Sequence, residues 1–217
     1  MQTRQYVRRV LVGGTMLVAL TAAVLSTANA HDDERQALLA RLNHLTTLEA
    51  DFAQQVTDAQ GELVQQLHGH LALARPNLLY WQSDAPDEMV MVADGQNLWY
   101  YNPFVEQVTI YQQQNAIAQS PLLLLLDGTS DAWAHYEIKV EGTSFALQPL
   151  PSASSAQSLQ LVFAEHGSPA QLTRIILDDG QGQISTIELE NVTLNQPVDK
   201  QLFTFKVPAG VDVDDQR

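Results

Sequence analysis

One arginine within an apolar stretch is the side chain of this sequence with the clearest chemical potential. Between Leu67 and Trp81, leucines alternate with polar or small residues, which is the pattern of a β-strand with two unlike faces. Arg75 continues the leucine side of that alternation and precedes Pro76. A guanidinium keeps its proton and carries several hydrogen-bond donors, so its unpaired burial would cost several kcal/mol. Either Arg75 ends a strand and reaches water, or another element brings acceptors to it inside a binding cavity.

Residues arranged for catalysis are much harder to find. The sequence has no cysteine, no Gly-x-Ser-x-Gly motif and no glycine-rich phosphate loop. His68 and His70 fall on one strand face, but a third histidine is not close in sequence, so we expect no metal site and no cofactor. The aspartates within residues 212–215 occupy an expected tail position, where they would be solvated. The sequence therefore favours binding over catalysis.

Apolar side chains suited to an acyl-chain pocket are more numerous. Met89 and Met91 share strand parity with Trp81, and methionine is an adaptable lining for variable guests. Five consecutive leucines, residues 122–126, follow Ser120-Pro121, a dipeptide that predicts a helix with serine at the N-cap. Leucines on every side indicate burial on more than one face, either as a core helix or as a lid over a ligand. The candidate cavity residues are Leu45, Leu48, Phe52, Leu73, Arg75, Leu79, Trp81, Met89, Met91, Leu122, Leu123, Leu125 and Leu126.

One helix and many strands must position these residues. Leucines and Phe52 recur at helical spacing, so residues 31–56 are predicted to form one amphipathic helix. From Gly61 onward, alternating runs separated by turn dipeptides predict strands, and the phenylalanines of residues 203–207 are expected to close the sheet. Around Asn191 the apolar phase slips, as a β-bulge requires. The pattern predicts a single antiparallel sheet of about ten strands, too many to stay flat, curved around a helix.

The first thirty residues have the order of a secretory signal peptide. Three arginines precede an apolar run that is short for a membrane span and is followed by Ala28-Asn29-Ala30. We expect cleavage after Ala30, which leaves residues 31–217 as one domain. The formal net charge is −14, and loss of the basic leader makes the remainder more acidic. This charge disfavours nucleic acid and anionic membranes as partners, while the lack of cysteine excludes disulfides and a lipid-modified N-terminal cysteine.

Short motifs along the chain occur in an order that is typical of one family. They are Phe52 with Gln54-Gln55, Gly61, Leu71 through Arg75-Pro76, Trp81, Asp94-Gly95, Trp99-Tyr100-Tyr101, Glu106-Gln107-Val108 before Pro121, and Phe203-x-Phe205-x-x-Pro208-x-Gly210-Val211-Asp212-Val213. In this order they resemble the LolA family of periplasmic lipoprotein carriers. One departure is Leu79, where members of the family often carry an aromatic residue. The position remains apolar, so its place in a pocket is preserved.

The resemblance implies an α+β, mainly β fold: an unclosed antiparallel β-barrel with the N-terminal helix and the Leu-rich helix covering its cavity. It implies a monomeric periplasmic carrier with no enzymatic activity. Its partners would be acylated lipoproteins, an inner-membrane lipoprotein-releasing ABC transporter and an outer-membrane lipoprotein receptor. The arginine matching Arg75 is expected to latch the lid by bonding its carbonyls in the empty form. The alternatives are a related lipid-sensing regulatory barrel, which needs a second domain, and an exported hydrolase, which needs a nucleophile.

Overall fold

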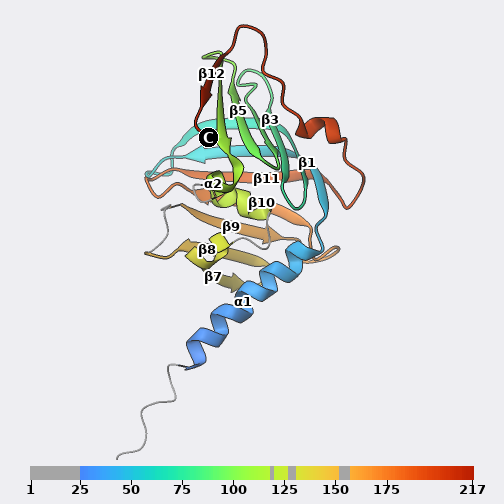
Figure 1. Ribbon diagram of the computed structural model, residues 1–217. Helices are drawn as coiled ribbons and strands as arrows, with labels where there is room; N and C mark the ends of the chain where they lie inside the picture. Colours follow the sequence, from blue (N-terminus) through green and yellow to red (C-terminus); the bar gives the residue numbers. More distant parts are fainter. Residues whose placement is uncertain (1–24, 118–119, 127–130, 152–156) are drawn as a thin grey trace, which may run out of the picture.

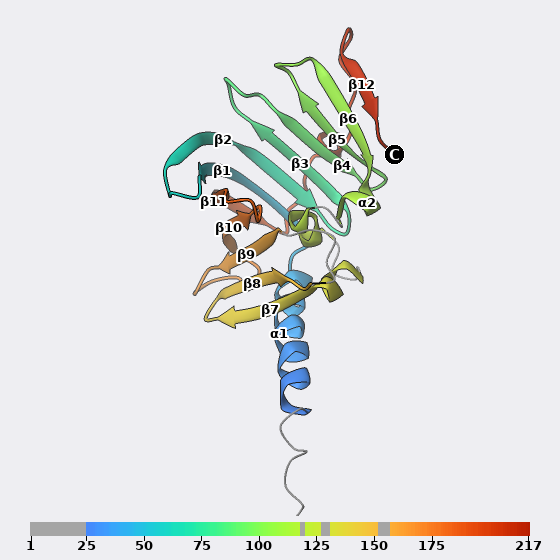
Figure 2. The same cartoon turned by 90° about the vertical axis from the view of Figure 1, so that its left-hand side faces the viewer.

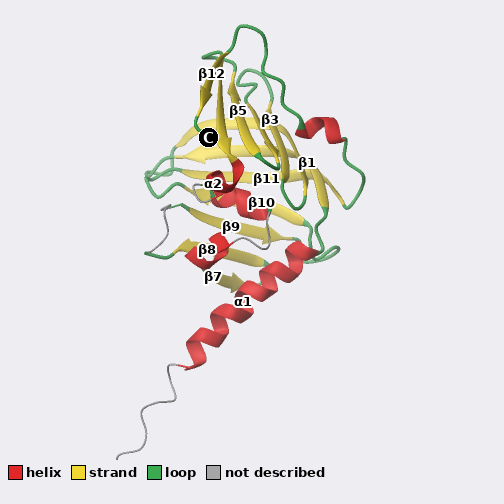
Figure 3. Ribbon diagram, viewed as in Figure 1, coloured by secondary structure: helices red, strands yellow, loops and turns green. Residues whose placement is uncertain are grey.

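Twelve strands form one continuous sheet in the computed structural model, which describes residues 25–117, 120–126, 131–151 and 157–217 (Figure 1). The strands are β1 (Thr47–Thr57), β2 (Leu63–Ala74), β3 (Leu78–Ser83), β4 (Val90–Asp94), β5 (Asn97–Asn102), β6 (Gln107–Gln112), β7 (Tyr136–Glu141), β8 (Ser144–Pro149), β9 (Ser158–Phe163), β10 (Leu172–Asp178), β11 (Ile184–Leu194) and β12 (Asp212–Asp215). The helices are α1 (Leu25–Asn43), α2 (Gln113–Ile117) and three short 3-10 helices, η1 (Pro121–Leu125), η2 (Asp131–His135) and η3 (Lys200–Phe203). Figure 3 shows how strongly strands dominate the molecule.

The sheet is unclosed, as the family resemblance implies, and it holds two more strands than the roughly ten that the pattern predicts. Its order is β12-β6-β5-β4-β3-β2-β1-β11-β10-β9-β8-β7, so β12 and β7 are its two edges. All neighbouring pairs are antiparallel except β12 with β6, which is parallel. The sheet curves so that its two ends lean apart, and α2 lies near the opening between them (Figure 2). The long central strands β1 and β2 hold the two halves together.

The prediction of a single helix over residues 31–56 is wrong. Helix α1 ends at Asn43, and β1 begins at Thr47. Leu48, Ala50 and Phe52 are buried at alternate positions of β1, with exposures of 0%, 2% and 2%. The same leucines and Phe52 also fit the helical period, and such short apolar runs satisfy both patterns. Strand pairing on both sides of β1 decides between them.

The turns agree better with the sequence. Asp94-Gly95 joins β4 to β5, with Gly95 at a φ of 95° that favours glycine. A register shift in β1, between Glu49 and Asp51, faces Asn191 of β11, which has a φ of 51°, so the expected bulge is present.

The end of the chain differs from the expectation. Phe203 ends the short helix η3, and the edge strand is formed by the acidic residues 212–215, which were expected to be a solvated tail. Residues 212–215 form a strand because their main chain pairs with β6. Main-chain pairing leaves no hydrophobic pattern in the sequence, so the strand could not be predicted from such a pattern.

The main hydrophobic core fills the concave side of the sheet. It joins Leu38 and Leu42 of α1, the inward residues of most strands, and the leucines of residues 122–126. Within the described residues, no helix has both the length and the apolar character needed to cross a membrane. The expected signal peptide lies mostly outside the described residues and stays a prediction.

Candidate functional site

A small apolar cavity lies between the concave face of the sheet and the leucines of residues 122–126. Its walls are ten side chains, all of them apolar: Leu48, Leu71, Leu73, Leu79, Trp81, Leu122, Leu125, Leu126, Leu172 and Ile175. The cavity volume that is open to a water molecule is only about 20 Å³. That volume is close to the minimum that a single water needs, so an acyl chain cannot enter without movement of a wall.

Seven of the thirteen predicted site residues line this cavity. They are Leu48, Leu73, Leu79, Trp81, Leu122, Leu125 and Leu126. Leu45, Phe52 and Leu123 are buried in the core around the cavity, and Met91 packs against that core from β4. Met89 precedes β4, where its sulfur accepts a hydrogen bond from the Tyr100 hydroxyl at 3.5 Å.

Three wall residues were missed by the sequence reasoning. Leu71 shares strand parity with Leu73, so the alternation already contained the signal for it. Leu172 and Ile175 come from β10, far along the chain, and a register shift between Leu172 and Arg174 disturbs the parity there. No local pattern brings β10 to β2, because the curvature of the whole sheet does so.

The wall beside the cavity is an aromatic stack. The ring of Phe52 lies on Trp81 with a centroid distance of 4.0 Å and an interplanar angle of 29°. Gly69 of β2 makes this possible, since a Cβ added there would lie 2.6 Å from the Phe52 ring. Phe52 thus reaches across β2 to support Trp81, which faces the cavity.

Arg75 joins two helix ends. Its Nε donates to the carbonyl of Leu126 at 3.3 Å, and its Nη1 donates to the carbonyl of Leu42. Leu42 lies in the last turn of α1, and Leu126 is the C-cap of η1. Carbonyls at helix ends lack intrahelical partners and carry partial negative charge, so a guanidinium is well suited to bind them. The sequence predicts that a buried Arg75 needs hydrogen-bond acceptors from another element, and the carbonyls at the ends of α1 and η1 are those acceptors.

The Leu-rich segment forms the helix that Ser120-Pro121 predicts, but as a 3-10 helix of a single short run. Pro121 occupies its first turn, whereas the Ser120 side chain makes no capping hydrogen bond. Leu122 is partly exposed, and Leu123 to Leu126 are each at most 3% exposed. Leu122, Leu125 and Leu126 face the cavity, while Leu123 and Leu124 belong to the core and not to the cavity wall.

The candidate metal pair lies on the opposite, convex face. His70 Nδ1 is 3.3 Å from Asp51, and its Nε2 is 3.9 Å from Glu49. A hydrogen bond from Asn191, followed by one from His70, lowers the pKa of Asp51 below its usual value. Among the described residues, no group of three or more histidines and acids is arranged to hold a metal ion.

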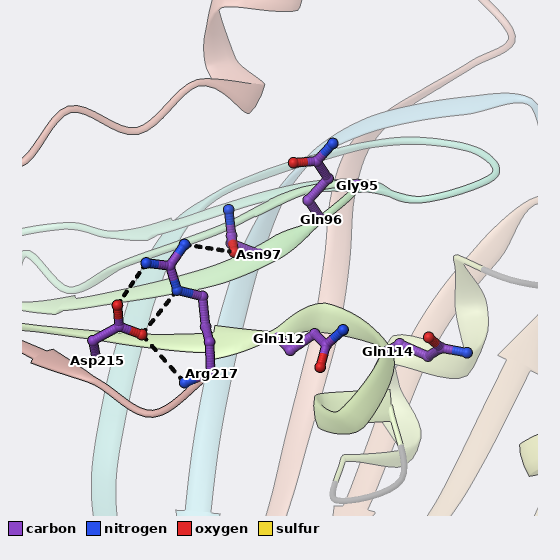
Figure 4. Close-up of a pocket in the computed structure, with 7 residues that line it drawn as sticks. All are labelled: Gly95, Gln96, Asn97, Gln112, Gln114, Asp215 and Arg217. Atoms are coloured by element: carbon purple, nitrogen blue, oxygen red, sulfur yellow. Dashed lines mark hydrogen bonds and ion pairs between the residues drawn. The ribbon is translucent and has the colours of Figure 1, made fainter.

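A second hollow is polar and open, and contains none of the predicted residues. It measures about 970 Å³ and is lined by Gly95, Gln96, Asn97, Gln112, Gln114, Asp215 and Arg217 (Figure 4). Arg217 binds Asp215 through Nε at 2.8 Å and also donates to Asn97. Hydrogen bonds from the side chain and then from the backbone N–H of Arg217 lower the pKa of Asp215 to about 2.

The open sheet, the apolar cavity and the leucine helix held by Arg75 together define a half-barrel with an apolar interior. Residues 43–206 match the family model described as outer membrane lipoprotein carrier protein LolA. The outer-membrane lipoprotein carrier protein of Idiomarina loihiensis is 43% identical over 201 residues, covering 93% of this chain and 96% of the relative. That of Proteus mirabilis is 36% identical over 202 residues, covering 93% and 98%. This chain belongs to the LolA family of outer-membrane lipoprotein carriers, which are transport proteins and not enzymes.

Solved structures of distant sequence share the fold. A DUF1329 family protein from Desulfovibrio piger aligns with a TM-score of 0.53 at 9% identity, covering 81% of this chain and 96% of that chain. A domain from Vibrio parahaemolyticus, described as a putative outer membrane lipoprotein-sorting protein, aligns with a TM-score of 0.50 at 11% identity, covering 80% and 97%. At such identities the likeness concerns the fold alone.

Proposed function

We propose that this chain carries acylated lipoproteins through the periplasm, with their acyl chains in the cavity between the sheet and residues 120–126, which we call the lid. The observation that carries the proposal is a cavity with only apolar walls, closed by a leucine helix whose end is held by one arginine. An apolar space of this kind binds hydrocarbon, because burial of each methylene stabilises the complex by about 0.8 kcal/mol.

The energetics of acyl chains favour direct transfer over release. Three acyl chains hold about 45 methylenes, and exposing them to water at about 0.8 kcal/mol each would cost more than about 30 kcal/mol. This exceeds the strongest non-covalent affinities, which are about 20 kcal/mol. A carrier therefore has to pass its cargo from one apolar cavity to another, with little net change in free energy.

Arg75 helps to balance the free energies of the loaded and the empty carrier. Its bonds to the carbonyls of Leu42 and Leu126 stabilise the empty, closed form. When acyl chains enter, the lid moves and these bonds are lost, so the latch opposes loading and favours unloading. Each hydrogen bond to a charged group is worth about 1.5–3 kcal/mol, which is enough to adjust a balanced transfer.

The partners follow from the route. We infer loading by an inner-membrane lipoprotein-releasing ABC transporter and delivery to an outer-membrane lipoprotein receptor, with residues 31–217 acting as a monomer in the periplasm. The names of the relatives, outer-membrane lipoprotein carrier proteins, support the cargo and the direction of transport. The net charge of the whole sequence is −14 and becomes −14 − 3 = −17 without the three arginines of the first thirty residues, which suits transient docking to basic surfaces on both partners.

The test is a loading and transfer assay with Arg75→Leu. The variant should accept acylated cargo from the inner membrane as well as the wild type, but yield less of it to the receptor. Removing the latch destabilises the empty, closed form, and this effect retains cargo. Arg174→Leu, which removes an exposed arginine paired with Glu188 on the sheet, is the matched control. Equal transfer yields from Arg75→Leu and the wild type would contradict the proposal.

A further inference from the structure

A single buried glutamine lies where the lid segment leaves the sheet. Gln113 is the first residue of α2 and is 4% exposed. Within the described part of the chain, it and Ser83 are the buried polar side chains. A buried amide is costly unless it is hydrogen bonded, so its partners reveal what it is positioned to do.

The partners of Gln113 are two turns of the sheet. Its Oε1 accepts a hydrogen bond from the Gly95 N–H at 2.9 Å, and its Nε2 donates to the carbonyl of Asn77 at 2.8 Å. Its own backbone N–H donates to the carbonyl of Gln96 at 2.9 Å. The two turns also touch each other, because a Cβ on Gly95 would lie 2.9 Å from the Asn77 side chain. The oxygen and the nitrogen of the amide are thus each hydrogen bonded to a backbone group, one in the β4–β5 connection and one in the β2–β3 connection.

Its neighbours in sequence behave differently. Gln112 and Gln114 are exposed and line the open polar hollow (Figure 4). Only the middle one of three consecutive glutamines points inward. All three residues have the same side chain, so the burial of Gln113 results from its position in the fold.

That position connects both halves of the latch. Asn77 follows Arg75 by two residues, so the turn held by Gln113 is the one that presents the guanidinium. On the other side, α2 packs against η1, whose C-cap Leu126 supplies the carbonyl that Arg75 binds. Gln113 therefore links the turn that carries the donor of the latch to the helix that packs against η1, which carries the acceptor.

We propose that Gln113 is a positioning residue for lid closure: it fixes the base of the lid to the turn that presents Arg75. This inference rests on the lid proposed above. With the Gln113 amide in place, α2 and the Arg75 turn move as one unit, and only the segment beyond α2 opens. Without it, α2 separates from the turn, the Leu126 carbonyl is no longer presented to Arg75, and the closed form becomes less populated.

The consequence is measurable as ligand affinity. A closed form that competes with loading weakens the apparent affinity in proportion to its population. Gln113→Leu, which has similar volume and no amide, should therefore bind a fluorescent palmitoylated peptide about three- to tenfold more tightly than the wild type, although its fold is less stable. A residue with only a structural role would lower stability without tightening binding.

Because the chain has no cysteine, the lid can be followed directly. Spin labels on Ser120→Cys and Gln66→Cys report the distance between the lid base and β2. In the empty protein, Gln113→Leu should broaden this distance distribution towards longer values. Gln113→Glu keeps an acceptor for Gly95 but loses the donor to Asn77, so it should shift the distribution in the same direction. It replaces Gln113→Leu in both measurements if the leucine variant does not fold.

Ser83→Ala is the matched control. Ser83 is 2% exposed and exchanges hydrogen bonds with the backbone of Met89, but it is not connected to the lid. It should lose stability with no change in distance or affinity. If the Gln113 variants behave like Ser83→Ala while Arg75→Leu shifts the lid, the role of Gln113 is refuted and the latch stands. If Arg75→Leu leaves the lid unchanged, the latch itself is refuted.

Discussion

The sheet has an aromatic stack on each of its two faces, and the two stacks have different surroundings. On the concave face, Phe52 lies on Trp81 at 4.0 Å. On the convex face, Phe205 from the C-terminal segment lies against Trp99 at 5.7 Å and Tyr101 at 6.0 Å. Trp81 pairs with Met91 of β4, and Trp99 pairs with the next residue of β4, Val92. Because successive side chains of a strand point to opposite faces, the two tryptophans lie on opposite faces of the sheet.

The two stacks differ in what surrounds them. The concave stack belongs to the main core, which also contains the cavity and the lid. On the other side, Val92, Val108, Ile110 and Phe203 are buried outside that core. The half of the sheet that includes β3 is thus also packed on its outer face, by residues that do not line the cavity. In the proposed carrier mechanism, this separation lets the lid move while the cavity wall stays in place.

The largest effect that tests this comparison is expected from Phe52→Ala. The ring is 2% exposed, and removal of a buried phenylalanine costs about 3–5 kcal/mol. Trp81 loses its support as well, so binding of an acylated peptide should change along with stability. Urea unfolding and peptide binding measure the two effects. A loss below about 1 kcal/mol would show that the stack adds little to the concave core.

The lid leucines should divide into two groups. Leu124→Gln places an unpaired amide in the core and should lose several kcal/mol of unfolding free energy. Leu122→Gln faces the cavity from a partly exposed position, so it should stay folded and bind acyl chains poorly. Thermal unfolding with acyl-peptide titration separates the two outcomes. Equal loss of stability at both positions would indicate an ordinary core helix and no lid.

Phe205→Ala should have a smaller effect than Phe52→Ala. The side chain is only partly buried, so its loss should cost about 1–2 kcal/mol and leave acyl binding unchanged. The same urea and binding measurements apply. Weaker acyl binding in this variant would mean that the convex side also shapes the cavity, and the proposed separation between the two faces would be wrong.

The smallest effect concerns pH and the anchor of Trp99. Burial raises the pKa of Asp94, but hydrogen bonds from the Asn97 N–H, the Trp99 indole and the Gln96 N–H outweigh it, so the pKa is lowered. Because the folded pKa lies below the unfolded one, this stabilisation is present above about pH 4 and is lost as pH falls further. Asp94→Asn should reduce the loss of stability that the wild type shows as the pH falls below about 4. The measurements are the pH dependence of stability and the NMR signal of the Trp99 indole N–H, which donates to Asp94. If the variant and the wild type have the same pH profile, or the same indole N–H chemical shift, the prediction is wrong.

Much of the fold could be predicted because its signals are local. The Asp94-Gly95 turn and the Asn191 bulge depend on backbone conformations that few residue types adopt. Arg75 could be singled out because a charge in a leucine pattern requires partners. The identity of those partners, the carbonyls of Leu42 and Leu126, could not be worked out from the pattern itself. The family resemblance led to helix-end acceptors, and only the fold shows that one of them belongs to α1.

The errors have physical causes as well. Residues 45–52 satisfy helical and strand periods alike, and pairing with β2 and β11 makes part of them a strand. Leu172 and Ile175 reach the cavity only because the sheet curves. Gln113 was overlooked because nothing in three consecutive glutamines marks the middle one as buried. Its burial depends on the β2–β3 and β4–β5 connections, which only the assembled sheet brings together.

The open sheet has one more consequence. An exposed strand edge is a template for pairing with another molecule, which leads to aggregation. Three of the four residues of β12 are aspartates, so two such edges would bring like charges together and repel each other. At the opposite edge, α1 packs against β7. The half-barrel can therefore remain unclosed, ready to admit a guest, and still be stored at high concentration without forming fibres.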